Sequence, residues 1–324
     1  MNFEAFLSTY QFKEVRAYPT NVKSSPLVSV CVQTYQHVGY IKQCLEGILM
    51  QQTNFEFEIL IGDDASEDGT REICIEYADR FPDKVKLFLH HRENNISIEG
   101  TPTGRFNFAY NLYQAKGKYL AICEGDDYWT DKEKLQKQVD FLENHQDYVL
   151  CAHNTTAIRE NKEIQSNHQF EDGDFESVLL YGLSQDTLSV LFKNKLKELP
   201  SWFFSCPMGD YPLYLLLLEQ GGKVKYMNEV MGAYRHHRGG MWSSMSKAKT
   251  GQRKIIALNL IDKGFNYSYK HLFKRAIEIN KRKFGMYTYS IFHVLKGKTP
   301  LRYYIFQKKN QLKRILNAYT SNSI

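Results

Sequence analysis

The stretch Tyr119-Leu120-Ala121-Ile122-Cys123-Glu124-Gly125-Asp126-Asp127-Tyr128-Trp129 joins an apolar run to a cluster of carboxylates. The run predicts a buried strand, and the acidic residues follow at its carboxyl end. Open α/β sheets place ligands at that end of their strands, and carboxylate oxygens are the ligands that hard divalent cations prefer. Two adjacent carboxylates repel each other unless something positive lies nearby, so Asp126 and Asp127 indicate a cation site. The alternative is a solvated turn in which Asp127 starts the next helix.

Predicted strands and helices alternate on both sides of this stretch. The apolar patterns predict strands over 27–32, 57–61, 85–89, 119–123, 148–152, 188–192 and 223–234, the last as one strand or two. Helices are predicted over 41–49, 71–81, 106–115, 131–142 and 212–219, and residues 155–175 are expected to be irregular. Such alternation predicts an α/β fold with a mostly parallel central sheet flanked by helices.

Length and charge divide the chain into three expected parts. These are an N-terminal surface leader over 1–25, a catalytic domain over 26–244, and a basic helical C-terminal region over 245–324. The C-terminal region has 18 Lys and Arg against two acidic residues, a net charge of +16. The other 24 Lys and Arg and 34 Asp and Glu give residues 1–244 a net charge of −10. An acidic body with a basic end favours a catalytic domain with a surface-binding segment over a nucleic-acid-binding protein.

Cysteine usage and the N-terminus indicate the compartment. The six cysteines are widely spaced, with no pair at the spacing of a metal knuckle or a redox motif, so we expect buried free thiols in a reducing environment. The N-terminus lacks a signal-peptide pattern, and no apolar run has the roughly 18 residues that a membrane-spanning helix needs. These features predict a cytoplasmic protein.

A second acidic element, Asp63-Asp64-Ala65-Ser66-Glu67-Asp68-Gly69, follows the strand predicted over 57–61. It is not a calcium loop, because Ile75 stands where such a loop needs a bidentate Glu. A carboxylate at this strand end, Asp64, is well placed to accept a hydrogen bond from a nucleobase or a ribose, although it could simply be a turn residue. Tyr35, in the loop after the first strand, could stack on a flat base or serve a structural role.

Two further sites carry candidate chemistry. Asp210 precedes an apolar helix, where it is either the N-cap or a general base that deprotonates an acceptor hydroxyl. The segment Tyr234-Arg235-His236-His237-Arg238-Gly239-Gly240 offers imidazoles for a metal and cations for phosphates, or is an ordinary loop.

Together these motifs resemble the family 2 inverting glycosyltransferases of the bacterial surface-polysaccharide type. The resemblance runs from Leu27 through Trp242, about two-thirds of the chain. Residues 28–35 are similar to the family's first strand and nucleotide loop, and residues 59–70 resemble its DDxSxDGT element. Residues 117–129 look like its version of the metal-binding DxD stretch.

The resemblance implies a GT-A fold, a nucleotide-diphosphate sugar that is most often UDP-linked, and Mn²⁺ or Mg²⁺. Thr34 and Tyr35 would bind the nucleotide, with Tyr35 stacked on the base, and Asp64 would hydrogen-bond to the base. The resemblance also implies that Asn107 and Asp126 contact the donor. Asp127 and His237 would bind the metal, with His236 as the fallback ligand, and Asp210 would be the general base.

The implied activity is transfer of a hexosyl or N-acetylhexosaminyl group to a saccharide or lipid-linked acceptor. The basic region 245–324 would then meet an anionic membrane surface at the inner face, or else form a solvated face or a contact in a homo-oligomer. Gln33 departs from the family pattern, and no QxxRW motif of the processive polymerases is present. A catalytically inactive sugar-nucleotide-binding protein and a nucleotidyltransferase remain as alternatives, and no nucleic-acid partner is expected.

Overall fold

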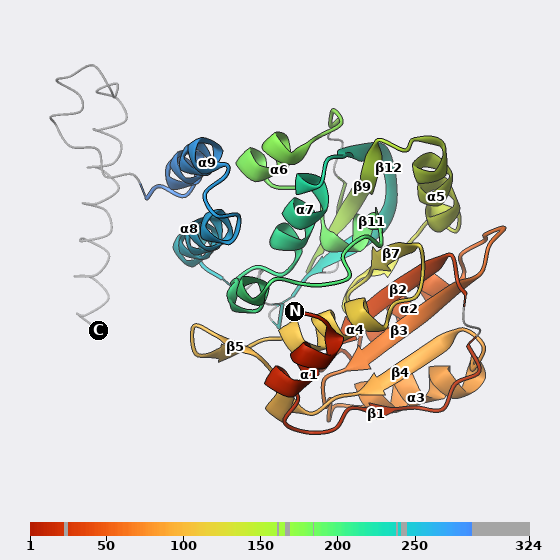
Figure 1. The fold of residues 1–324 in the computed structure, drawn as a ribbon. Coiled ribbons are helices and arrows are strands. Elements are labelled where there is room, and N and C mark those ends of the chain that lie inside the picture. Colours follow the sequence, from red (N-terminus) through yellow and green to blue (C-terminus); the bar gives the residue numbers. More distant parts are fainter. Residues whose placement is uncertain are drawn as a thin grey trace, which may run out of the picture.

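The structure is a computed structural model that describes residues 1–22, 25–160, 162–165, 169–183, 185–237, 239–240 and 245–286. Within these residues a ten-stranded sheet runs in the order β1, β4, β3, β2, β7, β11, β9, β12 and β8, with β10 paired to β9 outside this row (Figure 1). Its strands are β1 (Arg16–Ala17), β2 (Val28–Thr34), β3 (Phe57–Asp63), β4 (Val85–Leu89), β7 (Tyr119–Ile122), β8 (Tyr128–Trp129), β9 (Tyr148–Arg159), β10 (Lys162–Gln165), β11 (Leu191–Lys193) and β12 (Lys223–His236). The hairpin of β5 (Ser97–Ile98) and β6 (Thr101–Pro102) stands apart from it.

The centre of the sheet is parallel. Strand β2 pairs in parallel with both β3 and β7, and β3 pairs in parallel with β4. The antiparallel strand β11 joins this group to the parallel pair β9 and β12. Because β2, β3 and β7 point the same way, the residues that follow them meet at one edge, as the sequence predicts.

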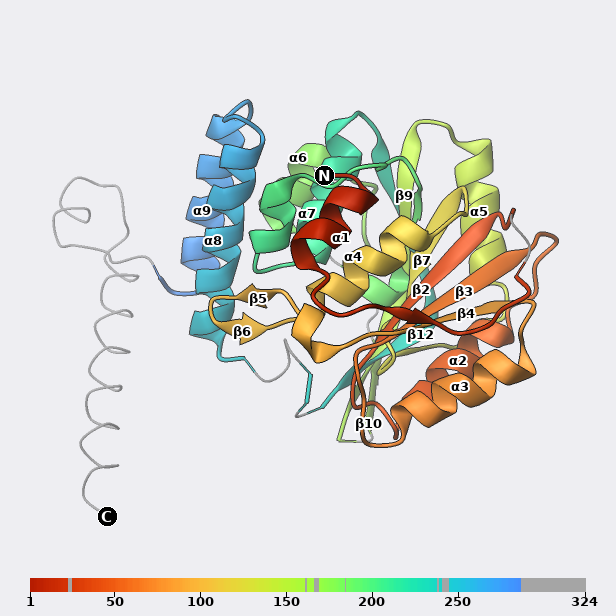
Figure 2. The same cartoon turned by 60° about the horizontal axis from the view of Figure 1, so that its bottom comes forward.

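Helices cover both faces of the sheet (Figures 1 and 2). Helices α2 (Ile41–Leu49), α3 (Thr70–Arg80) and α5 (Lys134–Asn144) contribute to one apolar core. The other core is formed with α1 (Phe3–Tyr10), α4 (Arg105–Gln114), α6 (Phe175–Tyr181), α7 (Asp210–Glu219), α8 (Lys247–Gly264) and α9 (Lys270–Lys283). On β2, Val30 and Val32 belong to the first core and Cys31 to the second, because neighbouring strand residues point to opposite faces. This two-sided burial explains why the strand sequences are continuously apolar.

Both ends of the described chain pack onto the domain. In the expected leader, Phe6 is fully buried, with its ring centroid 4.9 Å from that of Phe106 and 5.4 Å from that of Phe204. At the other end, α8 contacts α9 and the turn Ser201–Ser205, and α9 contacts α6. Residues 287–324 of the expected basic region lie outside the described residues.

The expectation of irregular structure over 155–175 is wrong at its start. Strand β9 continues to Arg159 and turns into β10, while α6 begins at Phe175. The polar residues Thr155 and Thr156 hide the strand in the sequence, but each pairs with β12, opposite Gly232 and Ala233. Long-range pairing therefore overrides the local polar pattern.

Strand β12 is continuous over 14 residues, which resolves the choice between one strand and two. Its register against β9 shifts between Met227 and Val230 and again between Val230 and Gly232. Beyond these irregularities the strand runs on to His236 and brings the residues after Tyr234 towards the acidic loop that follows β7.

Candidate active site

The loops after β2 and β3 are held together by hydrogen bonds from the first loop to side chains of the second. The backbone N–H groups of Gln36, His37 and Val38 donate to Ser66 Oγ, Thr70 Oγ1 and Asp68 Oδ2, at 3.0, 2.8 and 3.0 Å. Gln36 and Ala65 adopt left-handed backbone conformations, with φ of 56° and 58°, which are uncommon for residues other than glycine. The two loops therefore form one fixed rim at the carboxyl edge of the sheet.

On this rim, Asp64 and Tyr35 lie with two residues that the sequence analysis missed, Arg92 and Asn95. Asp64 Oδ2 accepts from Arg92 Nη1 at 2.7 Å and from Asn95 Nδ2 at 2.8 Å, and its Oδ1 is buried with no hydrogen-bond partner in the structure. The Arg92 guanidinium carbon lies 3.8 Å from the centroid of the Tyr35 ring. Burial raises the pKa of Asp64. An aromatic face beside a carboxylate, a guanidinium and an amide can recognise a flat heterocycle that carries both N–H and carbonyl groups.

The acidic loop, residues 123–127 between β7 and β8, packs through Gly125 against the loop that follows β2. Its N–H donates to the carbonyl of Gln33 at 2.9 Å. A Cβ at this position would lie 2.7 Å from Thr34 Oγ1 and 3.0 Å from His37 Nδ1. Only glycine permits this approach, which brings Asp126 beside the loop that carries Tyr35.

Asp126 lies between two histidines. Its Oδ2 is 2.9 Å from His237 Nε2 and 3.7 Å from His37 Nε2, and its backbone carbonyl accepts from Arg235 Nη1 at 2.6 Å. The pKa of Asp126 lies below its ordinary value, because the hydrogen bond with His237 and the charge of His37 outweigh the opposing effect of burial. An ionised carboxylate at this position can bind a cation.

Asp127 has different contacts from its neighbour. It is 2% exposed, and its Oδ1 accepts from the backbone N–H of Arg235 at 2.8 Å. Burial, followed by the charges of Asp126 and Glu124, raises the pKa of Asp127 well above its ordinary value. The structure thus places His237 against Asp126, whereas the family resemblance pairs His237 with Asp127.

His236 points away from this group. Successive side chains of a strand alternate between its two faces, and His236 lies near Arg159, with 3.5 Å between its Nε2 and Arg159 Nη2. Of the two consecutive histidines, His237 is therefore the one that the structure brings to the acidic loop.

Glu124, in the acidic loop, interacts electrostatically with the carboxyl groups of Asp186 and Asp210. Burial, followed by the charges of Asp126, Asp210 and Asp186, raises the pKa of Glu124 to about 8. Its Oε2 is buried with no hydrogen-bond partner in the structure. Asp186 Oδ2 accepts from Thr155 Oγ1 at 2.5 Å. The carboxyl groups after β7 thus lie close to those of Asp186 and Asp210, and a cation would stabilise their ionised forms.

Asp210 begins α7 but does not cap it. The N-cap is Gly209, and no side chain caps the helix. Arg105 packs behind Gly209, with its Nη2 3.3 Å from where a Cβ would lie, and it donates to the carbonyls of Phe203 and Cys206 at 2.7 and 3.0 Å. The capping alternative is therefore not observed, which leaves the Asp210 carboxylate available for chemistry.

A lysine from the C-terminal region also approaches this side. Lys254 on α8 has its Nζ 2.9 Å from the centroid of the Tyr211 ring. Burial lowers the pKa of Lys254 to about 7, and the charge of Asp210 opposes this shift. Helix α8 therefore contributes an amine that interacts electrostatically with Asp210, an arrangement that no local sequence pattern indicates.

Two other predicted residues are buried beneath the rim. Asn107 donates from Nδ2 to the carbonyl of Gly62 at 2.6 Å and is 1% exposed, so its amide ties α4 to β3. Thr34 Oγ1 lies 3.2 Å from His37 Nδ1. The sequence analysis missed His37; its position two residues after Tyr35, in the polar loop that follows β2, is the signal that could have identified it.

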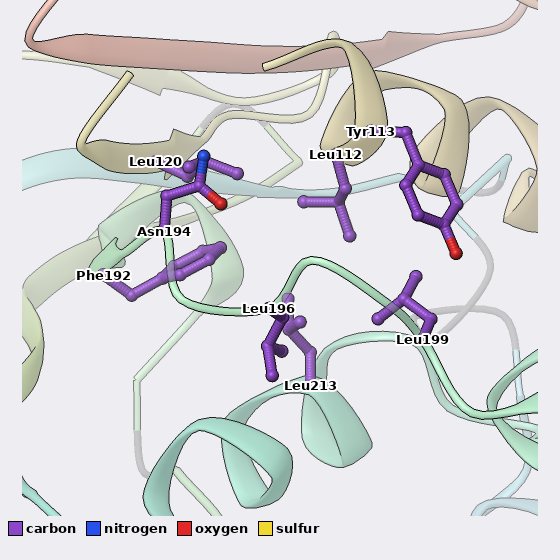
Figure 3. A pocket seen from close by; sticks show the side chains of 8 residues that line it. All are labelled: Leu112, Tyr113, Leu120, Phe192, Asn194, Leu196, Leu199 and Leu213. Carbon is purple, nitrogen blue, oxygen red and sulfur yellow. The ribbon is translucent and has the colours of Figure 1, made fainter. Parts of the chain in front are cut away.

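A cavity elsewhere in the molecule offers no second site. It has a volume of about 20 Å³, room for about one water molecule, between α4, β7, β11 and α7 (Figure 3). Its polar groups are already paired, since the Tyr113 hydroxyl donates to the carbonyl of Met1 and the Asn194 amide donates to that of Gly117. The rest of its lining consists of Leu112, Leu120, Phe192, Leu196, Leu199 and Leu213.

The donor set of the acidic loop suits a divalent cation. In the described part of the chain, no three His, Cys, Asp or Glu side chains are already arranged as a complete metal site. The ionised Asp126 and the adjacent His237 nevertheless provide the carboxylate and imidazole donors that Mn²⁺ accepts, and ligand oxygens can complete such a shell. Within the same described ranges, no helix is long and apolar enough to cross a membrane.

Comparison with known proteins identifies the family. The model of glycosyl transferase family 2 matches residues 29–199. An uncharacterized protein of Mycobacterium tuberculosis is 35% identical over 235 residues, which cover 70% of this chain and 63% of that relative. The UDP-Glc:alpha-D-GlcNAc-diphosphoundecaprenol beta-1,3-glucosyltransferase WfaP of Escherichia coli is 26% identical over 231 residues, 71% of this chain and 85% of WfaP.

Among solved structures, the mannosyltransferase PcManGT from Pyrobaculum calidifontis, in complex with GDP-Man and Mn²⁺, has a TM-score of 0.53 at 16% identity. The match covers 94% of this chain and 91% of that chain. The α/β architecture with its central parallel strands is that of the GT-A glycosyltransferases, as the sequence motifs predict. The chain belongs to glycosyl transferase family 2.

Proposed function

We propose that this protein is an inverting, metal-dependent glycosyltransferase that moves a hexosyl or N-acetylhexosaminyl group from a UDP-sugar to a hydroxyl group. The observation that carries the proposal is the meeting of Tyr35 and Asp64 with Asp126 and His237 at one edge of the sheet. These residues come from four separate segments, and their chemistry suits the base, the diphosphate and a cation of one donor molecule. WfaP, by its name, uses UDP-Glc, which supports the choice of UDP.

On the donor side, each residue has a proposed role that follows from its contacts. Asp64 accepts from the N–H of uracil, Arg92 and Asn95 donate to its carbonyl oxygens, and Tyr35 lies against the ring. Asp126 and His237 would hold the cation, with Asp127 fixing the backbone of Arg235. Mn²⁺ or Mg²⁺, when bound, would neutralise charge on the diphosphate leaving group.

On the acceptor side, Asp210 is the proposed general base. It would take the proton of the acceptor hydroxyl as that oxygen attacks the anomeric carbon and the bond to the diphosphate breaks. A single displacement of this kind inverts the configuration. The Lys254 amine interacts electrostatically with Asp210 on this side of the site.

The acceptor is proposed to be a saccharide or lipid-linked saccharide in surface polysaccharide synthesis. WfaP acts, by its name, on a diphosphoundecaprenol-linked sugar. Helix α9 presents exposed cations that would attract the anionic membrane surface where such carriers reside, among them Lys270, Lys274, Arg282 and Lys283. These cations support the proposal that the protein acts as a peripheral protein at the cytoplasmic face of the membrane.

A panel of nucleotide sugars tests the proposal. With Mn²⁺ present, UDP-Glc and UDP-GlcNAc should raise the melting temperature more than GDP-Man, and one of them should be slowly hydrolysed to UDP. Omitting Mn²⁺ should reduce both effects. Release of pyrophosphate from a nucleoside triphosphate would instead identify a nucleotidyltransferase, and tight UDP binding without hydrolysis or transfer would identify an inactive binding protein.

A further inference from the structure

His37 is held in a defined orientation by three neighbouring segments. Its backbone N–H donates to Thr70 Oγ1 at 2.8 Å, and its Nδ1 lies 3.2 Å from Thr34 Oγ1. Gly125 packs against the ring, since a Cβ there would lie 3.0 Å from Nδ1. With Nδ1 turned towards Thr34, the other ring nitrogen, Nε2, faces Asp126.

The Oδ2 atom of Asp126 that faces His37 is also the atom that contacts His237. The distances from this oxygen are 3.7 Å to His37 Nε2 and 2.9 Å to His237 Nε2. The two rings are nearly perpendicular, with an interplanar angle of 84° and centroids 6.3 Å apart. Two imidazole nitrogens thus approach one carboxylate oxygen from different directions.

The contacts of His37 are those of a metal-binding imidazole. Such a histidine donates its second N–H to a nearby oxygen, which fixes the tautomer and leaves the other nitrogen with its lone pair. Thr34 Oγ1 can accept that N–H from Nδ1. At 3.7 Å, Nε2 is beyond hydrogen-bond range of Asp126, so this nitrogen is not already used as a donor to it.

The two buried histidines of the described residues, His90 and His153, have different surroundings from the partly buried His37. The ring of His90 packs edge-on against Phe106 and Tyr110, with centroids 5.6 and 5.1 Å away. His153 is fully buried, and its Nδ1 lies 2.8 Å from the carbonyl of Asn154. His37 differs from both because its Nε2 faces a carboxylate.

We propose that His37 is a third protein ligand, through Nε2, of the divalent cation held by Asp126 and His237. The inference rests on the proposed function, because it needs the donor-bound metal. It assigns the loop after β2 two tasks: Tyr35 contacts the base, and His37 contacts the metal.

Pulsed electron paramagnetic resonance of the Mn²⁺–UDP complex tests the assignment directly, because nitrogen nuclei bound to Mn²⁺ modulate the signal. The wild-type protein should show two histidine nitrogens. His37→Asn and His37→Gln should each lose one and weaken Mn²⁺ binding about tenfold, the lower end of the range for disturbed metal shells. UDP binding without metal should stay unchanged, since Tyr35 and Asp64 are intact. His145→Asn, at an exposed position just after the end of α5, is the matched control.

A single histidine nitrogen in the wild-type spectrum would overturn the proposal without any substitution. Loss of a nitrogen in His237→Asn, but in neither His37 variant, would overturn it as well. Failure of the proposed function gives a different result, namely a wild-type protein that binds neither UDP nor Mn²⁺ in the presence of UDP.

Discussion

At the scale of single residues, Asp210 is set apart from the other carboxylates of the site. It stands at the first position of α7, with Lys254 near it and Arg105 packed behind the preceding glycine. Asp210→Asn keeps the size of the side chain but removes its ability to take a proton. We expect transfer to fall by about 10²- to 10⁴-fold, the usual contribution of a general base.

Donor binding should survive this substitution, because no proposed donor contact involves Asp210. Calorimetry with UDP and Mn²⁺, compared with steady-state transfer rates, separates the two effects. Asp140→Asn, at an exposed position on α5, is the control. Transfer at near-normal rates in Asp210→Asn would remove Asp210 as the base.

The two adjacent aspartates should also differ. Asp126→Ala removes the oxygen beside His237 and should abolish the gain in UDP affinity that Mn²⁺ provides. Asp127→Asn keeps an oxygen that can accept from the N–H of Arg235, so most of that gain should remain. Calorimetric titration of UDP with and without Mn²⁺ measures both. An equal loss in the two variants would indicate that Asp127 is also a metal ligand, as the resemblance to the DxD stretch implies.

The sequence predicted most of the residues that meet at the site and missed those that depend on long-range contacts. Tyr35, Asp64, Asp126 and His237 belong to ordered motifs, and the parallel strands bring them together. Arg92 was missed because its role depends on reaching Asp64 and Tyr35 across loops.

At the scale of elements, strands buried on both faces were the most predictable because their apolar runs are uninterrupted. The extension of β9 to Arg159 was not predictable, since its residues are polar and its pairing partner lies about 75 residues further on. Helix α8 showed a helical pattern in the sequence, but its contact with the site through Lys254 depends on tertiary packing.

The prediction that the protein binds an anionic membrane surface rests on the helix pair α8 and α9. Replacing Lys270, Lys274 and Lys283 by Glu reverses three exposed charges on α9. Because each basic residue near an anionic surface contributes about 1 kcal/mol, co-sedimentation with phosphatidylserine vesicles should be largely lost. The same three changes at the exposed residues Lys116, Lys132 and Lys197 form the control. Equal loss in both variants would show that net charge, rather than this helix, decides binding.

At the scale of the whole molecule, one core contains a buried amine. Lys134 is fully buried, donates to Gln138 Oε1 at 2.8 Å and lies 3.9 Å from the centroid of the Trp129 ring. Burial lowers the pKa of Lys134 to about 7 from 10.5. Between these values the unfolded chain binds more protons than the folded one, so this group makes stability rise with pH from about 7 to 10.5.

Lys134→Met should remove this dependence. The variant should be more stable than the wild type at pH 6, by a few kcal/mol, because the wild type must bury a charge or release a proton. The difference in the free energy of unfolding should shrink towards pH 10, where the lysine is neutral in the folded state. Urea unfolding at pH 6, 8 and 10 measures it, and a difference that does not change with pH would contradict the prediction.

The end of β12 carries two histidines in succession, of which one faces the acidic loop and the other faces Arg159. Because side chains alternate along a strand, a shift of one residue towards its carboxyl end would carry His236 into the position of His237. An imidazole would then still stand beside Asp126 after a single-residue insertion between Gly232 and His236. The tandem therefore offers a second imidazole to the proposed metal site if one residue is inserted into this strand.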